Sequence, residues 1–359
     1  MILCLASAAT AASFTFNRYA GRDGGGYADG SRGEAAFFYP QAIATDLLGN
    51  LYIADAANDV IRKITPDGLV STLAGAAGLR GTRDGVGAEA WFDTPQGVAV
   101  DSTGMVYVAD TGNQTIRRIT QDGMVTTFAG RVGVSGWLDA AGINAEFRSP
   151  IGLAFDSSDT LYVADYNNHA IRKIDRNGVV STFAGNPNHP GFSDGFGRSA
   201  FFLYPFGVAS FGSLVFVTDS ANNVVREILS SGEVKTVYGS PTEKGNRDGV
   251  GSTALFSRPT GITVDQTGVL YVTDTDNHQV RRLSPDLRVV SIAGSGVRGA
   301  SDGVGSAAQF DYPFGITIDS LQRLFVADTL NQFIRVGTEE GTAPPPPIPL
   351  SHRGRGARR

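Results

Sequence analysis

The chain has 359 residues, 42% of them hydrophobic, with 46 glycines and a formal net charge of −5. This composition is typical of a globular protein rich in tight turns and excludes a disordered chain. Because the sequence contains no basic block before its last residues, it lacks the clustered charge that neutralises phosphates, and we expect no nucleic-acid partner. The single cysteine, Cys4, has no second thiol for a disulfide bond or a zinc-thiolate site.

The first twelve residues, Met1 to Ala12, form an apolar run that ends in small residues. Such a run is typical of a secretory signal, although it lacks the usual basic start. We therefore expect a signal peptide over residues 1–12 and a secreted or extracytoplasmic protein, whereas a misassigned start codon would leave a cytoplasmic one. No later stretch approaches the roughly 18 consecutive apolar residues of a transmembrane helix, so we expect no membrane span.

One phrase then recurs six times along the chain. In its second copy it reads Pro95-Gln-Gly-Val-Ala-Val-Asp101, Val106-Tyr-Val-Ala-Asp110, Ile116-Arg-Arg-Ile119 and Val125-Thr-Thr-Phe-Ala-Gly130. An aspartate, an asparagine and an arginine recur every 54 or 55 residues. The aspartates are Asp55, Asp110, Asp165, Asp219, Asp274 and Asp328; the asparagines are Asn58, Asn113, Asn168, Asn223, Asn277 and Asn331; and the arginines are Arg62, Arg117, Arg172, Arg226, Arg281 and Arg335.

Each copy holds four short segments rich in Val, Ile, Tyr, Phe and Thr, which predicts four antiparallel strands joined by tight turns. Because one such sheet cannot bury both of its faces, the copies must stack, and radial stacking gives an all-β, six-bladed β-propeller over residues 13–338. The sixth copy ends after its third strand segment, while Phe16-Asn-Arg-Tyr-Ala-Gly21 matches the missing fourth one. We therefore expect the N-terminal strand to complete the last blade and close the ring, which leaves no exposed strand edge.

These residues resemble NHL repeats: Pro-x-Gly-[Ile/Val]-x-x-Asp, Leu-Tyr-Val-Ala-Asp, Asn-x-x-Ile-Arg-Lys-Ile and Val-x-Thr-x-Ala-Gly. The resemblance covers residues 14 to 337 and implies that the first strand of each blade lines the central channel and the fourth lies at the rim. Propellers similar to this one include an amidating lyase with zinc in its channel and gluconolactonase-like enzymes with calcium or zinc at the channel mouth. A metal-dependent hydrolase or lyase is therefore the alternative function.

The residues that could support such an enzyme are few. His169 and His278 occupy equivalent positions two blades apart, so both cannot reach one ion at the about 2.0–2.1 Å of a zinc–nitrogen bond. The aspartates that end the first strand, such as Asp46 and Asp101, follow the repeat and suit turns. We expect no catalytic residues, no metal site and no cofactor.

The repeated polar residues suit structural roles. We expect the Asp55-type carboxylates and Arg62-type guanidinium groups to join adjacent blades. Between blades a second phrase recurs, as in Arg247-Asp-Gly-Val-Gly251, and its aspartate suits a turn or a helix cap. The Ala-x-Phe that follows suits one buried helical turn with its phenylalanine wedged between blades. Asn113-Gln-Thr115 is a lone glycosylation sequon on a hairpin.

Function is expected where the copies of the repeat differ. The residue inside Pro-x-Gly varies around the ring, and strand direction places all copies at one channel mouth. These candidate binding residues are Gln41, Gln96, Ile151, Phe206, Thr260 and Phe314. An aromatic side facing a polar side suits a protein, peptide or glycan partner, although ordinary packing under the loop explains it equally well.

The chain ends in a different composition over residues 339–359, where a proline run precedes several arginines. Such a segment predicts a flexible, extended tail. We therefore expect a monomeric, non-catalytic propeller that acts as an interaction scaffold through one face of its channel.

Overall fold

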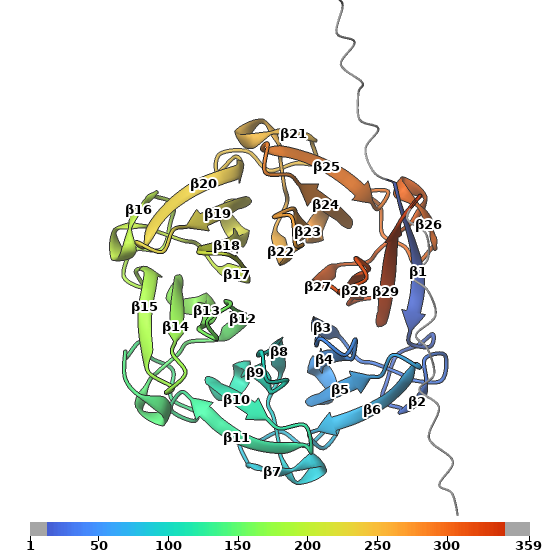
Figure 1. Cartoon of the computed structure of the whole chain (residues 1–359), viewed down its shortest axis with the longest axis vertical. Helices are drawn as coiled ribbons and strands as arrows, with labels where there is room; N and C mark the ends of the chain where they lie inside the picture. Colours follow the sequence, from blue (N-terminus) through green and yellow to red (C-terminus); the bar gives the residue numbers. More distant parts are fainter. Residues whose placement is uncertain (1–12, 342–359) are drawn as a thin grey trace, which may run out of the picture.

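The six copies of the repeat fold into six antiparallel sheets, which stand as blades around a common central axis (Figure 1). The computed structural model describes residues 13–341. Its helices are 3-10 turns of three residues, and within this range no helix is long and apolar enough to cross a membrane. The predicted all-β, six-bladed propeller is confirmed.

The four main strands of each blade follow the four segments predicted from the repeat. From the channel outward they are β3 (Pro40–Thr45), β4 (Leu51–Asp55), β5 (Val60–Ile64) and β6 (Leu69–Ala74) in blade 1; β8 (Pro95–Val100), β9 (Val106–Asp110), β10 (Thr115–Ile119) and β11 (Met124–Ala129) in blade 2; β12 (Pro150–Phe155), β13 (Leu161–Asp165), β14 (Ala170–Ile174) and β15 (Val180–Gly185) in blade 3; β17 (Pro205–Phe211), β18 (Leu214–Asp219), β19 (Val224–Ile228) and β20 (Glu233–Gly239) in blade 4; β22 (Pro259–Val264), β23 (Leu270–Asp274), β24 (Gln279–Leu283) and β25 (Arg288–Ala293) in blade 5; and β27 (Pro313–Ile318), β28 (Leu324–Asp328), β29 (Phe333–Glu339) and β1 (Phe14–Ala20) in blade 6.

A fifth, two-residue strand lies against the outer strand in every blade except blade 3. These short strands are β2 (Gly30–Ser31), β7 (Gly85–Val86), β16 (Gly195–Phe196), β21 (Gly249–Val250) and β26 (Gly303–Val304). They arise because the long connection between blades runs along the rim before it turns inward to the channel. The expected four-stranded blade is therefore extended by its own incoming connection.

The 3-10 turns occupy two repeated places. One set, η1 (Ala56–Asn58), η3 (Thr111–Asn113), η5 (Tyr166–Asn168), η7 (Ser220–Asn222) and η9 (Thr275–Asn277), joins the second and third strands. The other set, η2 (Gly87–Glu89), η4 (Gly142–Asn144), η6 (Gly197–Ser199), η8 (Gly251–Thr253) and η10 (Gly305–Ala307), lies in the connections. The second set has no buried residue, so the expected buried helical turn is wrong; the buried residues are the alanine and phenylalanine that follow each turn, such as Ala90 and Phe92.

The hydrophobic core is divided among the junctions between blades. Phe92, which follows η2, is fully buried among residues of both neighbours, such as Tyr52 of blade 1 and Val106 of blade 2. Equivalent phenylalanines occupy the other junctions: Phe37, Phe147, Phe202, Phe256 and Phe310. The ring is thus held by apolar wedges rather than by any covalent link among the described residues.

The N-terminal strand closes the ring as predicted, with β1 antiparallel to β29. Phe16 lies opposite Gly337, whereas the corresponding pairs elsewhere are an isoleucine or leucine opposite a valine, as in Ile64 and Val70. A Cβ atom on Gly337 would lie 2.3 Å from the Phe16 ring. In the closing blade, the large side chain of this pair therefore lies on the outer strand, as Phe16, and the facing residue on the third strand is Gly337.

Candidate functional site

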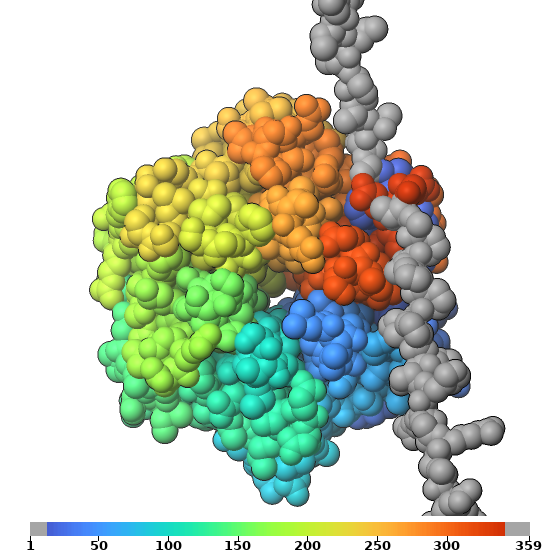
Figure 2. All heavy atoms as spheres, in the orientation of Figure 1, coloured from blue at the N-terminus to red at the C-terminus, as the bar shows by residue number. Residues whose placement is uncertain are grey.

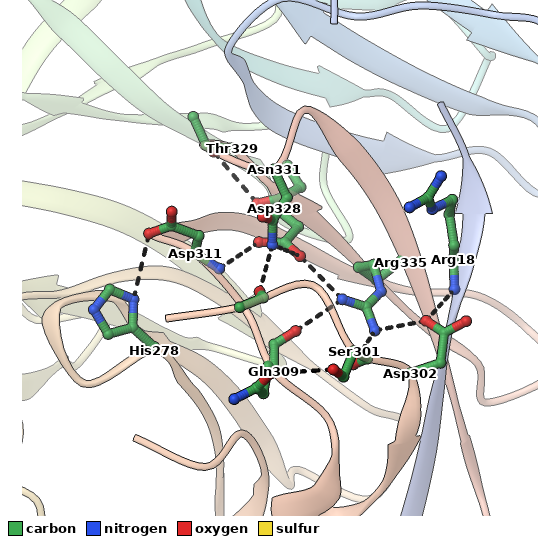
Figure 3. A network of polar contacts seen from close by, with 12 residues as sticks. Arg18, His278, Ser301, Asp302, Gln309, Asp311, Asp328, Thr329, Asn331 and Arg335 are labelled. Atoms are coloured by element: carbon green, nitrogen blue, oxygen red, sulfur yellow. Dashed lines mark hydrogen bonds and ion pairs between the residues drawn. The ribbon is translucent and has the colours of Figure 1, made fainter. Parts of the chain in front are cut away.

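Each blade contains a buried polar cluster, here called the latch, made of the repeated aspartate, asparagine and arginine. In blade 6, Arg335 donates from Nη1 to Asp328 Oδ2 at 3.1 Å and from Nη2 to Asp302 Oδ1 at 2.8 Å (Figure 3). Asn331 donates to the same Asp328 oxygen at 2.8 Å. The guanidinium also reaches the carbonyl oxygens of Gln309 and Ser301, so both of its terminal nitrogens are satisfied.

The latch joins each blade to its own incoming connection rather than to the adjacent blade, so that prediction is wrong. Asp302, like Asp84 in blade 2, belongs to the connection and accepts from the latch arginine. The connection aspartates cap no helix, because the 3-10 turns have no side-chain cap from them. They instead accept a backbone N–H of the outer strand, as Asp84 does from Thr127. The structure assigns them to folding the connection onto the rim.

Two residue assignments also change in the structure. The latch asparagine of blade 4 is Asn222, which donates to Asp219 Oδ2 at 2.8 Å, and not Asn223. Asn113, the sequon residue, is buried and donates to Asp110 and to the carbonyl of Gly81. Because this amide is engaged inside the fold, the folded hairpin does not offer it for glycosylation.

Burial controls the electrostatics of the latch. It raises the pKa of Asp55, Asp110, Asp219, Asp274 and Asp328 to about 6, against the opposing effect of the hydrogen bonds and the paired arginine. The pKa of Asp165 is raised for the same reason. At neutral pH the five carboxyl groups with a pKa of about 6 are mostly ionised, and all six face arginines that are almost fully buried. The latch is a structural cluster whose charges depend on each other.

Each of the six candidate binding residues is the second residue of an innermost strand, and together they lie around one mouth of the channel. Gln41, Gln96, Ile151 and Phe206 line a small hollow there, and Phe314 contacts Phe206 with ring centroids 5.6 Å apart. Figure 2 shows how closely the blades meet around a narrow central opening. The prediction that these positions share one mouth agrees with their placement, while their role in binding stays a prediction.

The same residues largely fill the mouth. Phe206 of blade 4 and Phe314 of blade 6 meet because blade 5 carries the smaller Thr260, which is completely buried. On the other side, Gln96 donates to Gln41 across blades 2 and 1 at 3.0 Å. Ile151 is also buried. These side chains therefore serve partly as a plug, which leaves the neighbouring exposed residues as the more accessible surface.

Below this plug, the channel is lined by a ring of aliphatic side chains, and Thr45, Ser210, Thr263 and Thr317 line it further along. Six aliphatic side chains form this ring, one from each blade: Ile43, Val98, Leu153, Val208, Ile262 and Ile316. Among residues 13–341, no three His, Cys, Asp or Glu side chains lie together in a way that could hold a metal ion. His189, in a connection, stacks on Phe201 at 5.3 Å, and His352 lies outside the described residues.

A second set of residues at the mouth was missed by the sequence analysis. The residue before each first-strand proline has a positive φ of 50° to 54°, although residues before proline favour extended backbone. We call these six the mouth row: Tyr39, Thr94, Ser149, Tyr204, Arg258 and Tyr312. The signal that could have found them is their variety at a repeat position next to an otherwise constant proline.

The mouth row is held by side chains from the preceding blade. Each acceptor follows the latch asparagine, and we call the six the acceptor row: Asp59, Gln114, His169, Asn223, His278 and Gln332. His169 Nδ1 accepts the backbone N–H of Tyr204 at 3.1 Å, and Gln114 Oε1 accepts that of Ser149 at 2.6 Å. The first five members make this bond; Gln332 Oε1 has no hydrogen bond.

Aromatic and cationic side chains gather at the mouth over blades 3 to 6. Tyr166 lies 4.8 Å from Tyr204 and 6.1 Å from Phe206 between ring centroids. Arg258 lies over both Tyr312 and Phe314, at 5.4 and 5.3 Å from their centroids. Phe38 and Tyr39 of blade 1 are about 40% exposed. We call the surface formed by these side chains the aromatic face: Phe38, Tyr39, Tyr166, Tyr204, Phe206, Arg258, Tyr312 and Phe314.

Comparison with known proteins agrees with this architecture. The sequence profile described as NHL repeat matches residues 92–119, 147–174 and 256–283. NHL repeat-containing protein 2 of Bos taurus is 32% identical over 339 residues, which cover 83% of this chain and 46% of that relative. The chain thus spans less than half the length of this relative.

Two solved structures share the fold at low sequence identity. An auxiliary nutrient binding protein from Bacteroides thetaiotaomicron superposes with a TM-score of 0.70 at 16% identity, covering 91% of this chain and 76% of that one. A gluconolactonase from Xanthomonas campestris gives 0.57 at 14% identity, covering 84% and 86%. Because a binding protein and an enzyme share this fold, the fold alone does not assign a function.

Proposed function

The chain belongs to the NHL-repeat six-bladed β-propellers, and we propose that it is a non-catalytic interaction scaffold that binds a protein or peptide at the aromatic face. We further propose that it is a monomer outside the cytoplasm; the apolar run that suggests export lies in residues 1–12, outside the described part of the chain. The observation that carries the proposal is the gathering of Tyr, Phe and Arg side chains at one mouth.

The composition of this face favours a protein or peptide over other partners. Tyrosine, phenylalanine and arginine are enriched in interface cores, and tyrosine and arginine supply many of the residues that dominate binding energy. Tyr204 remains 37% exposed although its backbone is fixed, so binding would not need to order it. A glycan stacked on the same rings is the competing outcome.

A metal-dependent hydrolase or lyase has less support. The middle of the channel presents six aliphatic side chains where such an enzyme would need acids, bases or ligands. The nearby latch carboxylates are committed to arginine and backbone donors. Nothing among the described residues favours this second function.

The test is a binding screen with a variant that keeps the fold. In Tyr39→Thr/Tyr204→Ser, each tyrosine is replaced by the residue that the same row carries in blades 2 and 3, Thr94 and Ser149. The immobilised full chain is screened at pH 7.5 against a displayed peptide library and a glycan array. We expect peptides that bind the parent and bind the variant at least ten-fold more weakly.

The matched control is Leu47→Ser/Leu48→Ser, which removes two highly exposed leucines at the hairpin tip at the opposite end of β3. This control should retain peptide binding. Equal binding by the parent and the mouth variant would overturn the proposal, and hits confined to the glycan array would replace the partner class.

A further inference from the structure

His278 fixes the backbone of Tyr312 through a hydrogen bond that depends on the charge of the imidazole. Its Nδ1 accepts the backbone N–H of Tyr312 at 3.2 Å, and the two rings meet edge to face at 4.9 Å. A backbone N–H can only donate, so Nδ1 must be unprotonated and the ring proton must lie on Nε2. The observed geometry therefore requires neutral His278.

Tyr312 in turn shapes one side of the aromatic face. Its hydroxyl accepts from Arg298 Nη2 at 2.8 Å, and its ring lies beneath the guanidinium groups of Arg258 and Arg298. Tyr312 has a φ of 51° directly before Pro313, a conformation that is disfavoured for residues before proline, and its bond to His278 is one support for it. Loss of the His278 bond would remove one such support.

Asp311 offers His278 a second partner. Its Oδ1 is buried without a hydrogen bond and lies 3.9 Å from His278 Nδ1 (Figure 3). The same oxygen lies 3.6 Å from Arg298 Nε. A protonated Nδ1 could no longer accept from Tyr312 but could donate to this carboxylate. One small movement of the imidazole would thus exchange a backbone partner for a carboxylate.

The charged groups around His278 oppose one another. Asp311 and Asp276 raise its pKa, whereas Arg298 and Arg258 lower it. Burial is the largest effect, and the pKa of His278 lies below its ordinary value. The imidazole is therefore neutral at pH 7 and takes up its proton only below the ordinary histidine pKa.

We propose that His278 and Asp311 form a pH-responsive pair that positions Tyr312 when His278 is neutral and releases it when His278 is protonated. This regulation rests on the proposed function, because Tyr312 belongs to the aromatic face. Protonation adds one proton at Nδ1, breaks the bond from the Tyr312 N–H, and forms a bond from Nδ1 to Asp311 Oδ1. Partner binding at the blade 6 side of the face weakens as a result.

His169 in blade 3 supplies a natural contrast. It accepts the N–H of Tyr204 in the same way, but Leu203 stands where Asp311 stands, and the nearby charge is Arg148. Protonated His169 therefore gains no carboxylate partner. The exchange is specific to the junction of blades 5 and 6.

The experiment is a pH titration of the isotope-labelled full chain, without any partner, followed by nuclear magnetic resonance from pH 8 to 5. We expect the ring nitrogens of His278 and the amide of Tyr312 to shift with one common midpoint below the ordinary histidine pKa of about 6.5. The Ser149 amide, held by Gln114, should not follow that transition. In His278→Gln, which copies Gln114, the Tyr312 amide should lose the transition, and in Asp311→Asn the midpoint should move to lower pH.

A Tyr312 amide that shifts equally in His278→Gln, or stays still while His278 titrates, would overturn the pair, as would an unchanged midpoint in Asp311→Asn. A separate arm compares binding of a peptide selected in the screen at pH 7.5 and 5.5, with a fall of at least three-fold expected in the parent and not in His278→Gln. Failure to find any peptide would count against the proposed function but would leave the titration result standing.

Discussion

The latch and the mouth row are built by the same repeat, yet they differ in what is kept constant. All six latches use the same three residue types with nearly the same distances, as the Arg172 to Asp165 and Arg226 to Asp219 pairs show at 2.8 Å each. All six mouth-row residues share one backbone conformation but have four different side chains. In the latch the side chains themselves are constant, whereas in the mouth row only the backbone conformation is constant.

This difference indicates which positions of the repeat can carry different side chains without loss of the fold. A buried charge must keep its partner, so the latch admits no change in one member alone. Five of the six mouth-row N–H groups donate to a side-chain acceptor from the preceding blade, and these acceptors are chemically varied: Asp59, Gln114, His169, Asn223 and His278. The side chains of the mouth row point to function because the fold does not specify them.

The largest expected effect tests the latch side of this comparison. Arg117→Met leaves the fully buried Asp110 without its cation and the Trp91 and Arg83 carbonyls without their donor. We expect the free energy of unfolding to fall by about 3–5 kcal/mol, because removing one partner of a buried ion pair strands the other. Chemical denaturation measured by circular dichroism gives the value.

The matched control for the latch is Arg176→Met. Arg176 is 67% exposed and pairs with Asp159 at 3.2 Å, so its loss should cost no more than about 1 kcal/mol. If the two variants were destabilised equally, the latch would not be the element that makes the repeat rigid.

The parts of the fold that could be predicted are those that repeat by residue type. Even spacing of the latch aspartates revealed six blades, and the incomplete last copy revealed closure by β1. The mouth row was hidden because its members Tyr, Thr, Ser and Arg are not one residue type, and because proline predicts an extended residue before it. The acceptor row was hidden because its bonds join residues 34 or 35 apart in different blades, as from His169 to Tyr204.

The candidate site was predicted only in position. The six residues inside Pro-x-Gly do surround one mouth, but sequence could not show that Thr260 is small enough for Phe206 and Phe314 to meet above it. Likewise, two adjacent asparagines in blade 4 concealed that Asn222 belongs to the latch and Asn223 to the acceptor row. Both distinctions depend on contacts between blades.

An intermediate effect is expected at the closing blade, where the interior does vary. Gly337→Ile places a side chain in the space of the Phe16 ring, and overpacking of this kind typically costs about 1–3 kcal/mol. Phe16→Val alone should also destabilise, because it leaves a cavity opposite a glycine. Together they restore the isoleucine–valine pair that blade 1 uses at Ile64 and Val70, so the double variant should recover most of the loss.

Thermal and chemical unfolding of the four proteins in this cycle measures the coupling between the two sites. Additive losses would mean that β1 is not packed on β29 as described. Recovery of stability in the double variant would show that these two interior positions vary as a compensated pair. The side chains of the mouth row vary without such compensation.

The smallest expected effect concerns the acceptor row and the pH dependence of stability. Burial, with Arg148 nearby, lowers the pKa of His169 below its value in the unfolded chain. As pH falls through the unfolded value of about 6.5, the unfolded state therefore binds a proton that the native state resists, and this contribution to stability is lost. The latch aspartates act in the opposite sense, because a native pKa of about 6 lets the folded state take up protons before the unfolded one does.

The net pH profile of the protein mixes these opposing contributions, so the informative quantity is a difference between two proteins. His169→Gln keeps a side-chain acceptor for the Tyr204 N–H, as Gln114 does for Ser149, but removes the titrating group. The latch contribution is common to both proteins and cancels. We expect the stability of the parent to fall relative to the variant as pH decreases below about 6.5, with no such divergence between pH 7 and 8. Parallel profiles across the whole range would show that the imidazole is not held neutral by the Tyr204 N–H, and the acceptor row would then be incidental to the backbone of the mouth.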